Sequence, residues 1–335
     1  MINVLYIGNA LSKEDKTQTT IEILGAKLKE ICEVKIASNK SNKVLRFCDM
    51  MWMVFKWRKS TDYVLIDTYS TLNFYYAVVV GFLCRVYKIK YIPILHGGNL
   101  EYRLKNNRTL SKSFFGNAHK LIAPSKFLYD IFKNNKFKNL EYIPNFIEID
   151  KYDFNQREMD RIQLLWVRSF SSIYNPKLAV DVLEDLSNFD TNASLTMVGP
   201  DVDGSLNSVR QYAKGKNLNI EFTGKLSKEE WIALSKSHNI FLNTTNIDNT
   251  PVSVIEAMAL GIPVVSTNVG GMPYLIENKE EGLLVDPNNR EAITRAILVL
   301  KENSELLLKI TQNAREKVEL FDWDVVKSKW QVILQ

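Results

Sequence analysis

Two acidic residues eight positions apart, Asp248 and Glu256, flank a segment whose chemistry suits an anion. Pro251 lies between them, and its fixed φ and missing N–H suit the first turn of a helix, with Asn249 or Thr250 as the N-cap. The free N–H groups and the positive dipole end of such a helix attract a phosphate. We therefore predict that the two carboxylates bind groups on opposite sides of a bound phosphate. The alternative is a surface helix with an acidic cap.

The residues after Glu256 predict the end of this helix and the start of a strand. The helix should run to about Leu260 and end at Gly261, because glycine adopts the left-handed conformation found after many helix ends. A β-branched strand is predicted at 263–267. The pair Gly270-Gly271 comes after this strand, and backbone without side chains at a strand end permits the close approach of a ligand.

An arginine and a histidine at predicted strand ends are further candidates for binding. Arg168 comes directly after the strand predicted at 162–167, and a guanidinium binds phosphate through two hydrogen bonds. His96 ends a buried strand and precedes Gly97 and Gly98, so an imidazole and exposed amides meet at the carboxyl edge of a sheet. The alternatives are a surface salt bridge for Arg168 and packing in the core for His96.

The composition argues against a metal site. The chain has three histidines, and we interpret His119 and His238 as structural because each precedes an apolar strand. The three cysteines, Cys32, Cys48 and Cys84, lack the spacing of a zinc site. An odd number of cysteines without such spacing fits a reducing compartment.

Short apolar runs alternate with helical patterns along the chain, which is typical of parallel sheets covered by helices. In the first half, strands are predicted at 3–7, 34–37, 63–67, 91–95, 121–124 and 141–144. In the second half, they are predicted at 162–167, 194–198, 220–222, 240–243, 263–267 and 282–285. The expected fold class is α/β, with two doubly wound, Rossmann-like domains.

The length of 335 residues predicts two domains. A polar, irregular segment after Pro144 reads as the linker, which places the domains at 1–150 and 151–319. A final helix at about 320–335, which contains Trp323 and Trp330, is expected to pack back onto the first domain. The first strand ends at Gly8-Asn9, and no complete G-x-G-x-x-G comes after it, which disfavours a nicotinamide enzyme.

Charge is distributed unevenly along the chain. Residues 1–150 hold 23 Lys and Arg against 13 Asp and Glu, a net of +10, and the remainder has a net of −5. A basic half suits lipid headgroups or a phosphorylated acceptor, whereas nucleic acid is not expected because no basic and aromatic stacking face is evident. The chain starts with a strand, and its longest apolar run, 74–84, is too short to span a membrane. We therefore expect a cytoplasmic protein.

The segment 43–59 is predicted to form an amphipathic helix. Its apolar residues at helical spacing are Val44, Phe47, Cys48, Met51, Trp52 and Phe55. We interpret these residues as the core-facing side of the helix. The alternative is a helix that lies on the inner face of an anionic cell membrane, with Met53 and Trp57 adding apolar surface beside Lys56, Arg58 and Lys59.

Together these features resemble the retaining glycosyltransferases of family four, which have the GT-B fold of two facing Rossmann-like domains. The similarity is strongest in DNTPVSVIEAMALGIPVVSTNVGGMP, moderate in WVRSFSSIYNP and IPNFIEIDKYDF, and weaker in LHGGN. It implies the transfer of a hexosyl or N-acetylhexosaminyl group from a UDP- or GDP-linked sugar to a glycan or lipid-linked glycan, of the bacterial surface-glycan type. It also implies that the reaction uses no cofactor and no metal ion.

The resemblance implies roles for individual residues. Glu256 would bind the ribose hydroxyls and Asp248 the hydroxyls of the transferred sugar, while Arg168 would neutralise the leaving phosphate. His96 would lie across the cleft, near the donor sugar. The other implied donor-binding residues are Gly8, Asn9, Lys177, Gly199, Lys225, Asn249, Thr250, Pro251 and Val252. The implied acceptor-side residues are Gly97, Gly98, Asn99 and Arg103.

Three positions depart from the pattern of the family. Asp248 stands where glutamate is usual, and Tyr274 stands where an acidic residue is often found after the glycine pair. Ile173 and Tyr174 occupy the places of a phosphate-binding lysine, for which we predict Lys177 as a substitute. Two other functions stay open: a nucleotide-sugar epimerase or hydrolase of the same fold, and a non-catalytic subunit that binds a nucleotide sugar or a lipid.

Overall fold

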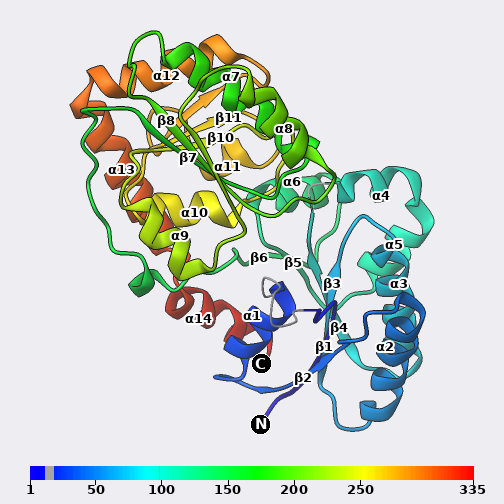
Figure 1. Ribbon diagram of the computed structural model, residues 1–335. Helices are drawn as coiled ribbons and strands as arrows, with labels where there is room; N and C mark the ends of the chain where they lie inside the picture. Colours follow the sequence, from blue (N-terminus) through cyan, green and yellow to red (C-terminus); the bar gives the residue numbers. More distant parts are fainter. Residues whose placement is uncertain (12–18, 98) are drawn as a thin grey trace. The chain divides into compact units, whose positions relative to one another are not determined.

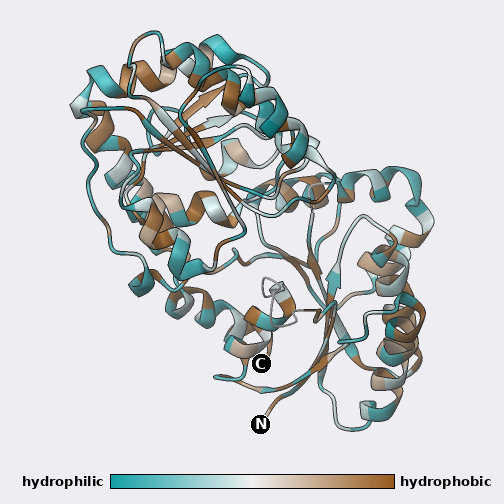
Figure 2. Cartoon of the chain, viewed as in Figure 1, coloured by the Kyte–Doolittle hydropathy of each residue, from teal (hydrophilic) through white to brown (hydrophobic). Residues whose placement is uncertain are grey.

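The computed structural model describes residues 1–11, 19–97 and 99–335, which form two compact units. Unit 1 comprises Met1–Asn145 together with Asp324–Gln335, and unit 2 comprises Phe146–Trp323. Each unit contains a six-stranded parallel sheet covered by helices (Figure 1), and hydrophobic residues are concentrated along many of the strands (Figure 2). The predicted α/β fold class with two Rossmann-like sheets is confirmed.

The sheet of unit 1 has the order β2-β1-β3-β4-β5-β6. Its strands are β1 (Asn3–Ile7), β2 (Glu33–Ala37), β3 (Tyr63–Thr68), β4 (Lys90–Leu95), β5 (Leu121–Ala123) and β6 (Leu140–Tyr142). The order reverses between β1 and β3, so the carboxyl ends of these two strands mark the point where α/β sheets usually bind ligands. Its helices are α1 (Thr20–Leu28), α2 (Lys43–Trp57), α3 (Asn73–Val86), α4 (Leu100–Asn106), α5 (Arg108–Gly116), α6 (Lys126–Asn134) and α14 (Trp323–Ile333).

The sheet of unit 2 has the order β12-β11-β10-β7-β8-β9. Its strands are β7 (Gln163–Val167), β8 (Ser194–Val198), β9 (Ile220–Gly224), β10 (Ile240–Asn243), β11 (Val264–Thr267) and β12 (Leu283–Val285). Its α-helices are α7 (Pro176–Leu186), α8 (Ser205–Lys214), α9 (Lys228–Ser235), α10 (Val252–Ala259), α11 (Met272–Leu275), α12 (Arg290–Glu302) and α13 (Ser304–Glu319). Two short 3₁₀ helices, η1 (Ile149–Lys151) and η2 (Ser172–Tyr174), complete the unit. All twelve strands lie within two residues of their predicted positions.

The orientation of α2 differs from the prediction. The helix buries Arg46, Met50 and Val54, whereas most of the apolar stripe expected to face the core, including Val44 and Trp52, is exposed. The sequence contains apolar residues on both sides of this helix, so spacing alone could not decide which side packs on the sheet. Of the residues named in the membrane-bound alternative, Met53 packs against the core and the Trp57 ring is covered by Lys35, whose ammonium lies 3.5 Å from the ring centre. Membrane contact of this helix stays a prediction.

The last helix, α14, is firmly packed. Trp323 and Trp330 are both buried, as expected from their place in an amphipathic pattern. Within unit 1, Lys327 of α14 forms an ion pair with Glu30 at 2.7 Å, and the Lys329 ammonium lies 5.3 Å from the centre of the Tyr142 ring. Among the described residues, no helix has both the length and the apolar content needed to cross a membrane.

His238 has a structural role in unit 2. Its Nδ1 lies 2.9 Å from the Leu234 carbonyl oxygen, which can only accept, so Nδ1 carries a proton. Nε2 lies 2.9 Å from the Thr196 hydroxyl, which donates to it in the neutral ring. Burial lowers the pKa of His238 below its ordinary value of 6.5.

This lowered pKa predicts a pH dependence of stability. As the pH falls below 6.5, the unfolded chain binds a proton at His238 before the folded chain does, so the free energy of unfolding should decrease. Above pH 6.5 that contribution is fully present. Urea unfolding measured across this pH range should show a flatter profile for His238→Gln than for the wild type. His119→Gln should flatten the profile less, because His119 is less deeply buried; an unchanged slope in His238→Gln would contradict this assignment.

Candidate active site

Helix α10 begins and ends close to the predicted positions. Pro251 is the N-cap, with φ −71° and ψ 122°, and its carbonyl oxygen accepts hydrogen bonds from the amides of Val254 and Ile255 at 3.1 and 3.3 Å. The N-cap predicted at Asn249 or Thr250 is therefore one or two residues too early. The helix ends at Leu260, and Gly261 has φ +72°, as expected. The amides of Val252 and Ser253, the first two residues of α10, have no acceptor inside the helix, which makes this end suitable for an anion.

The glycine pair after β11 serves the loop before α10. Gly270 has φ +54°, and a Cβ on it would lie 2.1 Å from the carbonyl oxygen of Asp248. A Cβ on Gly271 would lie 1.6 Å from the carbonyl oxygen of Asn249. The Gly271 amide also donates to the Asp248 carbonyl at 2.9 Å. A close approach at these glycines is therefore made by the protein's own backbone, and the approach of a ligand to them stays a prediction.

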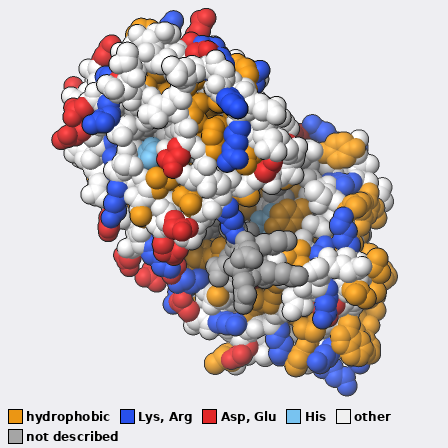
Figure 3. Space-filling view, viewed as in Figure 1, with side chains coloured by type: hydrophobic (Ala, Val, Ile, Leu, Met, Phe, Trp, Pro, Cys, Tyr) orange, Lys and Arg blue, Asp and Glu red, His pale blue; other side chains and the backbone are white. Residues whose placement is uncertain are grey.

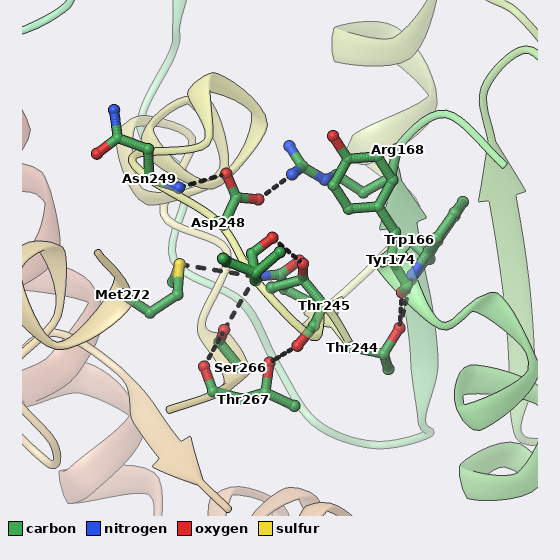
Figure 4. A network of polar contacts seen from close by, with 12 residues as sticks. Trp166, Arg168, Tyr174, Thr244, Thr245, Asp248, Asn249, Ser266, Thr267 and Met272 are labelled. Carbon is green, nitrogen blue, oxygen red and sulfur yellow. Dashed lines mark hydrogen bonds and ion pairs between the residues drawn. The ribbon is translucent and has the colours of Figure 1, made fainter. Parts of the chain in front are cut away.

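Buried hydroxyl groups fix the loop that carries Asp248 (Figure 4). Trp166 donates through Nε1 to the Thr244 hydroxyl at 3.0 Å, and that hydroxyl donates to the Tyr174 carbonyl at 2.8 Å. The Thr267 hydroxyl donates to the Thr245 carbonyl at 2.6 Å. Thr244, Thr245 and Thr267 are fully buried, so these bonds satisfy groups that would otherwise be costly to bury.

Arg168 and Asp248 form an ion pair between Nη2 and Oδ2. Each side chain is only 13% exposed. The Asn249 amide donates to the other carboxylate oxygen of Asp248 at 2.9 Å. The Arg168 Nε is buried and has no hydrogen-bond acceptor among the described residues. Arg168, predicted to bind the phosphate, is thus in contact with Asp248, predicted to bind the sugar. The Arg168 Nε remains an unused donor.

Burial controls the protonation of Asp248. It raises the pKa of this carboxyl above its ordinary value, and the opposing effects of Arg168 and of the Asn249 amide only partly offset it. A bound cation, or a ligand that donates hydrogen bonds to Asp248, would therefore stabilise the ionised form of this carboxyl. Asp248 is suited to accept hydrogen bonds from hydroxyl groups in a partly dry environment.

Tyr174 occupies the position where a lysine was expected and packs on Arg168. The guanidinium carbon lies 4.1 Å from the centre of the Tyr174 ring, a typical cation–π distance. The turn around Tyr174 is joined to the Asp248 loop, because the Asn246 amide donates to the Ile173 carbonyl at 2.8 Å. Tyr174 therefore orients Arg168, a role that no lysine could fill in the same way.

Glu256 is buried within α10, with its side chain 5% exposed. Its Oε1 accepts a hydrogen bond from the Tyr152 hydroxyl at 2.7 Å and lies 2.5 Å from the Lys228 ammonium. Burial and the adjacent Glu256 carboxylate hold the pKa of Tyr152 far above its ordinary value, so Tyr152 remains a donor. Both contacts use Oε1, and no described residue donates to Oε2. This second oxygen can accept hydrogen bonds from a ligand.

The remaining predicted donor-binding residues of unit 2 have varied surroundings. A Cβ on Gly199, which has φ +150°, would lie 1.8 Å from the Arg168 carbonyl oxygen, whereas a Cβ on Gly224 would meet nothing within 4 Å. Bare backbone is thus open at Gly224, next to the exposed Lys225. The Lys177 ammonium lies 4.0 Å from the centre of the Tyr212 ring, so its charge is directed at α8, and its role as a substitute for the missing lysine stays a prediction.

A second polar cluster lies in unit 1, at the carboxyl ends of β1, β3 and β4. His96 Nε2 lies 2.8 Å from Asp67 Oδ1, and the Tyr6 hydroxyl donates to the same oxygen at 2.8 Å. The Tyr69 ring stacks on the imidazole with a centre separation of 5.0 Å. A Cβ on Gly8 would lie 2.6 Å from Asp67 Oδ2, so glycine is needed there. The carboxylate fixes the orientation of the imidazole.

The residues predicted on the acceptor side have structural contacts in the described part of unit 1. Arg103 donates through Nε to the Ser70 carbonyl at 2.6 Å and through Nη1 to the Asn107 side chain at 2.9 Å, so it joins α4 to the loop after β3. Asn99 is the N-cap of α4, and Gly97 has φ +82°. Asn9 lines a small pocket beside Gly8. Gly98 lies outside the described residues.

Residues 1–11, 19–97 and 99–335 contain no cluster of three or more His, Cys, Asp or Glu side chains arranged to hold a metal ion. The cationic groups of the site in unit 2 are Arg168 and Lys228, together with the positive end of α10. Asp248 therefore lies before the start of α10 and Glu256 lies within the helix. The positive end of α10 lies between these two acids, Arg168 pairs with Asp248, and Lys228 pairs with Glu256.

Sequence reasoning missed several residues of both clusters. Tyr152 lies in the segment interpreted as a linker, and Lys228 lies at the start of a helix with no motif around it. No sequence signal for their contacts with Glu256 was available. Asp67 could have been found, because a carboxylate near the end of a buried strand has the same signature as His96.

This architecture, with two parallel-sheet units and a polar site at strand ends, is that of a GT-B glycosyltransferase. The chain belongs to the family of glycosyl transferases group 1, whose model matches residues 148–317, slightly more than half of the chain. It is therefore an enzyme of the glycosyltransferase class.

Individual proteins support this assignment. An uncharacterised glycosyltransferase of Methanocaldococcus jannaschii is 26% identical over 315 residues, which cover 85% of this chain and 78% of the relative. Sucrose-phosphate synthase of Spinacia oleracea is 35% identical over 89 residues, but this match covers only 27% of this chain and 8% of that protein. The crystal structure of HepE from Anabaena, in complex with UDP and glucose, has a TM-score of 0.77 at 16% identity and covers 100% of this chain and 99% of its own, which shows the shared fold.

The buried hydroxyl network predicts a specific loss of stability. Thr244→Val keeps the shape of the side chain but leaves Trp166 Nε1 and the Tyr174 carbonyl without a partner, which should lower the free energy of unfolding by about 1–3 kcal/mol. Thr191→Val, at an exposed position in the same unit, is the matched control and should change stability little. Urea unfolding followed by tryptophan fluorescence measures both variants. Equal stability of the two variants would show that the network does not hold the loop.

Proposed function

We propose that the enzyme is a retaining glycosyltransferase that moves a sugar from a nucleotide-diphosphate sugar to a glycan or lipid-linked glycan. The observation that carries the proposal is the arrangement around α10, where Glu256 and the Arg168–Asp248 pair lie on either side of a helix start that suits a phosphate. UDP is bound by HepE, which shares the fold, so a UDP-linked donor is the first candidate and a GDP-linked donor the second.

Each end of the site suits one part of such a donor. The open Oε2 of Glu256 would accept hydrogen bonds from the ribose hydroxyls, while Tyr152 and Lys228 hold Oε1 in place. The amides of Thr250 and Val252, at the start of α10, would bind the diphosphate, whereas the Asn249 amide donates to Asp248. Asp248 would accept hydrogen bonds from the transferred sugar. The open backbone at Gly224 and Lys225 would lie beside the base, with Gly199 supporting Arg168.

The charges of the site suit departure of a diphosphate. In the proposed reaction, the bond between the anomeric carbon and the phosphate oxygen breaks as the acceptor hydroxyl bonds to the same face of the sugar. The acceptor proton passes to the departing phosphate oxygen. Negative charge grows on the diphosphate, and Arg168 together with the α10 amides would stabilise it. Because these groups supply the positive charge, we propose that transfer does not require a divalent metal ion.

Unit 1 would bind the acceptor. Its net basic sequence suits a phosphorylated, lipid-linked acceptor, and His96, oriented by Asp67, would contact a sugar hydroxyl. Assembly of a surface polysaccharide at the cytoplasmic side of a cell membrane is the setting that we propose. Hydrolysis or epimerisation of the nucleotide sugar is the second candidate, because Asp248 is shorter than the glutamate usual in the family.

The proposed donor site predicts a large effect of one substitution. Glu256→Ala removes the acceptor of the ribose hydroxyls and leaves Lys228 unpaired, so transfer should fall by at least about a hundredfold, in line with the loss of a charged hydrogen bond at a catalytic site. Transfer is measured by incubating the protein with UDP- and GDP-linked sugars and a lipid-linked acceptor. Glu291→Ala, an exposed acid on α12, is the matched control.

The same assay separates the candidate functions. Product on the acceptor supports transfer, free sugar without an acceptor supports hydrolysis, and a thermal shift with nucleotide but no turnover supports a binding subunit. Addition of a chelator should leave the rate unchanged. Near-normal transfer by Glu256→Ala would refute the donor-site assignment, and strict dependence on a divalent ion would refute the metal-free reaction.

A further inference from the structure

The outer face of α3 is unusually apolar for a surface helix. Tyr75, Phe82 and Val86 lie on this face and are 40, 54 and 55% exposed. Arg85 is the only charged residue within the helix. Surface helices normally carry polar side chains on the side away from the core, as α12 does with exposed Glu291 and Arg295. The solvent-facing side of α3 therefore lacks the polar side chains that are usual on a surface helix.

Helix α2 extends this apolar surface. Its exposed residues include Val44, Leu45 and Trp52, which are 69, 61 and 56% exposed. Phe55 of α2 joins the two helices, because its ring lies 5.7 Å from that of Trp52 and 6.3 Å from that of Tyr87, which caps α3. In Figure 3, the flank of unit 1 at the right of the view, over α2 and α3, is largely hydrophobic with basic groups along it. We call the exposed apolar residues of α2 and α3 the apolar face.

Basic side chains border the apolar face. Lys56 and Lys59 lie at the end of α2, and Arg58 covers the Phe55 ring at 4.0 Å. Arg85 donates to the Ser113 hydroxyl of the neighbouring helix α5 at 3.2 Å, and α5 adds exposed Lys112. Acidic residues are scarce here: α3 and α5 contain none, and the single acid of α2, Asp49, is hydrogen-bonded to Ser38.

We propose that the apolar face and its basic border dock unit 1 onto an anionic lipid membrane. Aromatic and aliphatic side chains would enter the boundary between headgroups and acyl chains, and the lysine and arginine side chains would contact the anionic headgroups. Aromatic residues next to basic ones are the combination enriched where proteins meet the membrane–water interface.

Two other binding partners, a second copy of the chain and nucleic acid, fit this surface less well. In a symmetric dimer formed through this face, the basic border of one copy would meet that of the other, and like charges would repel. Nucleic acid would supply the negative charge, and the exposed Trp52 and Phe82 rings could stack on bases, but the exposed aliphatic residues Val44, Leu45 and Val86 would stay in water. A lipid surface satisfies both the apolar and the basic groups.

This inference deepens the proposed function, because docking would bring unit 1 to a lipid-linked acceptor. The two claims are tested by different measurements. Vesicle binding requires no donor and no turnover. Conversely, a thermal shift with UDP and hydrolysis or transfer with a detergent-dispersed acceptor require no vesicle. Either claim can therefore fail while the other holds.

The test is vesicle flotation of the full chain with two lipid compositions, phosphatidylcholine alone and phosphatidylcholine mixed with phosphatidylglycerol. The wild type should float with the anionic vesicles, and added salt should weaken this binding. The double variant Trp52→Glu/Phe82→Glu should bind at least about tenfold more weakly, because it places charge in the apolar face. Lys56→Glu/Lys59→Glu should show a similar loss, confined to the anionic vesicles. Phe189→Glu, an exposed aromatic position in unit 2, is the matched control and should bind like the wild type.

Each result bears on the proposal directly. All the substituted residues are exposed, so circular dichroism and the UDP-induced thermal shift should match the wild type and exclude misfolding. Absence of vesicle binding in the wild type would overturn the proposal, as would unchanged binding in both double variants. If the wild type instead self-associates in solution and Trp52→Glu/Phe82→Glu makes it monomeric without any vesicle binding, the face is an interface between copies and the proposal is wrong.

Discussion

The contact between Arg168 and Asp248 is the interaction around which unit 2 is arranged. Both side chains are largely removed from water, and removing one partner of such a pair leaves an unpaired charge that costs several kcal/mol. The surrounding structure holds the two side chains in place. The Thr244 and Thr267 hydroxyls anchor the Asp248 loop, and Tyr174 packs on the guanidinium. Because Gly271 has no side chain, the Asp248 loop can lie against its backbone. The rigid setting means that a ligand would meet charges already in position, which lowers the cost of binding.

In the proposed function, one short helix would bind the two ends of a donor, and the same preorganisation would make this possible. Asp248 precedes α10 and Glu256 lies within it, so the helix start separates their carboxylates. Glu256 is held by Tyr152 from the segment after β6 and by Lys228 from α9, which come from distant parts of the sequence. The function we propose depends on this convergence, because both oxygens of Asp248 are held by the protein, whereas Glu256 is held through Oε1 alone.

Local sequence patterns predicted the fold well and the side-chain partners poorly. Buried parallel strands are continuous apolar runs bounded by turns, and for this reason every strand was placed within two residues. The end of α10 was predicted because Gly261 must adopt a positive φ. By contrast, the outward side of α2 could not be predicted, since both sides of that helix are apolar. Sequence also could not show that Gly270 and Gly271 lie against the backbone of Asp248 and Asn249.

The exposed apolar residues of α2 and α3 in unit 1 and the polar residues around the start of α10 in unit 2 are chemically different surfaces. Some basic residues of 1–150 border the exposed aromatic and aliphatic side chains of α2 and α3, namely Lys56, Arg58, Lys59, Arg85 and Lys112. Docking and donor binding would therefore use separate surfaces.

Titration calorimetry with UDP and UMP tests whether Arg168 binds the diphosphate and Glu256 the ribose. In the wild type, UDP should bind more tightly than UMP. Arg168→Gln should remove most of that difference, because the lost charge contacts the terminal phosphate, whereas Glu256→Gln should weaken both nucleotides by a similar factor and keep the difference. An equal preference for UDP over UMP in the wild type and Arg168→Gln would contradict the account.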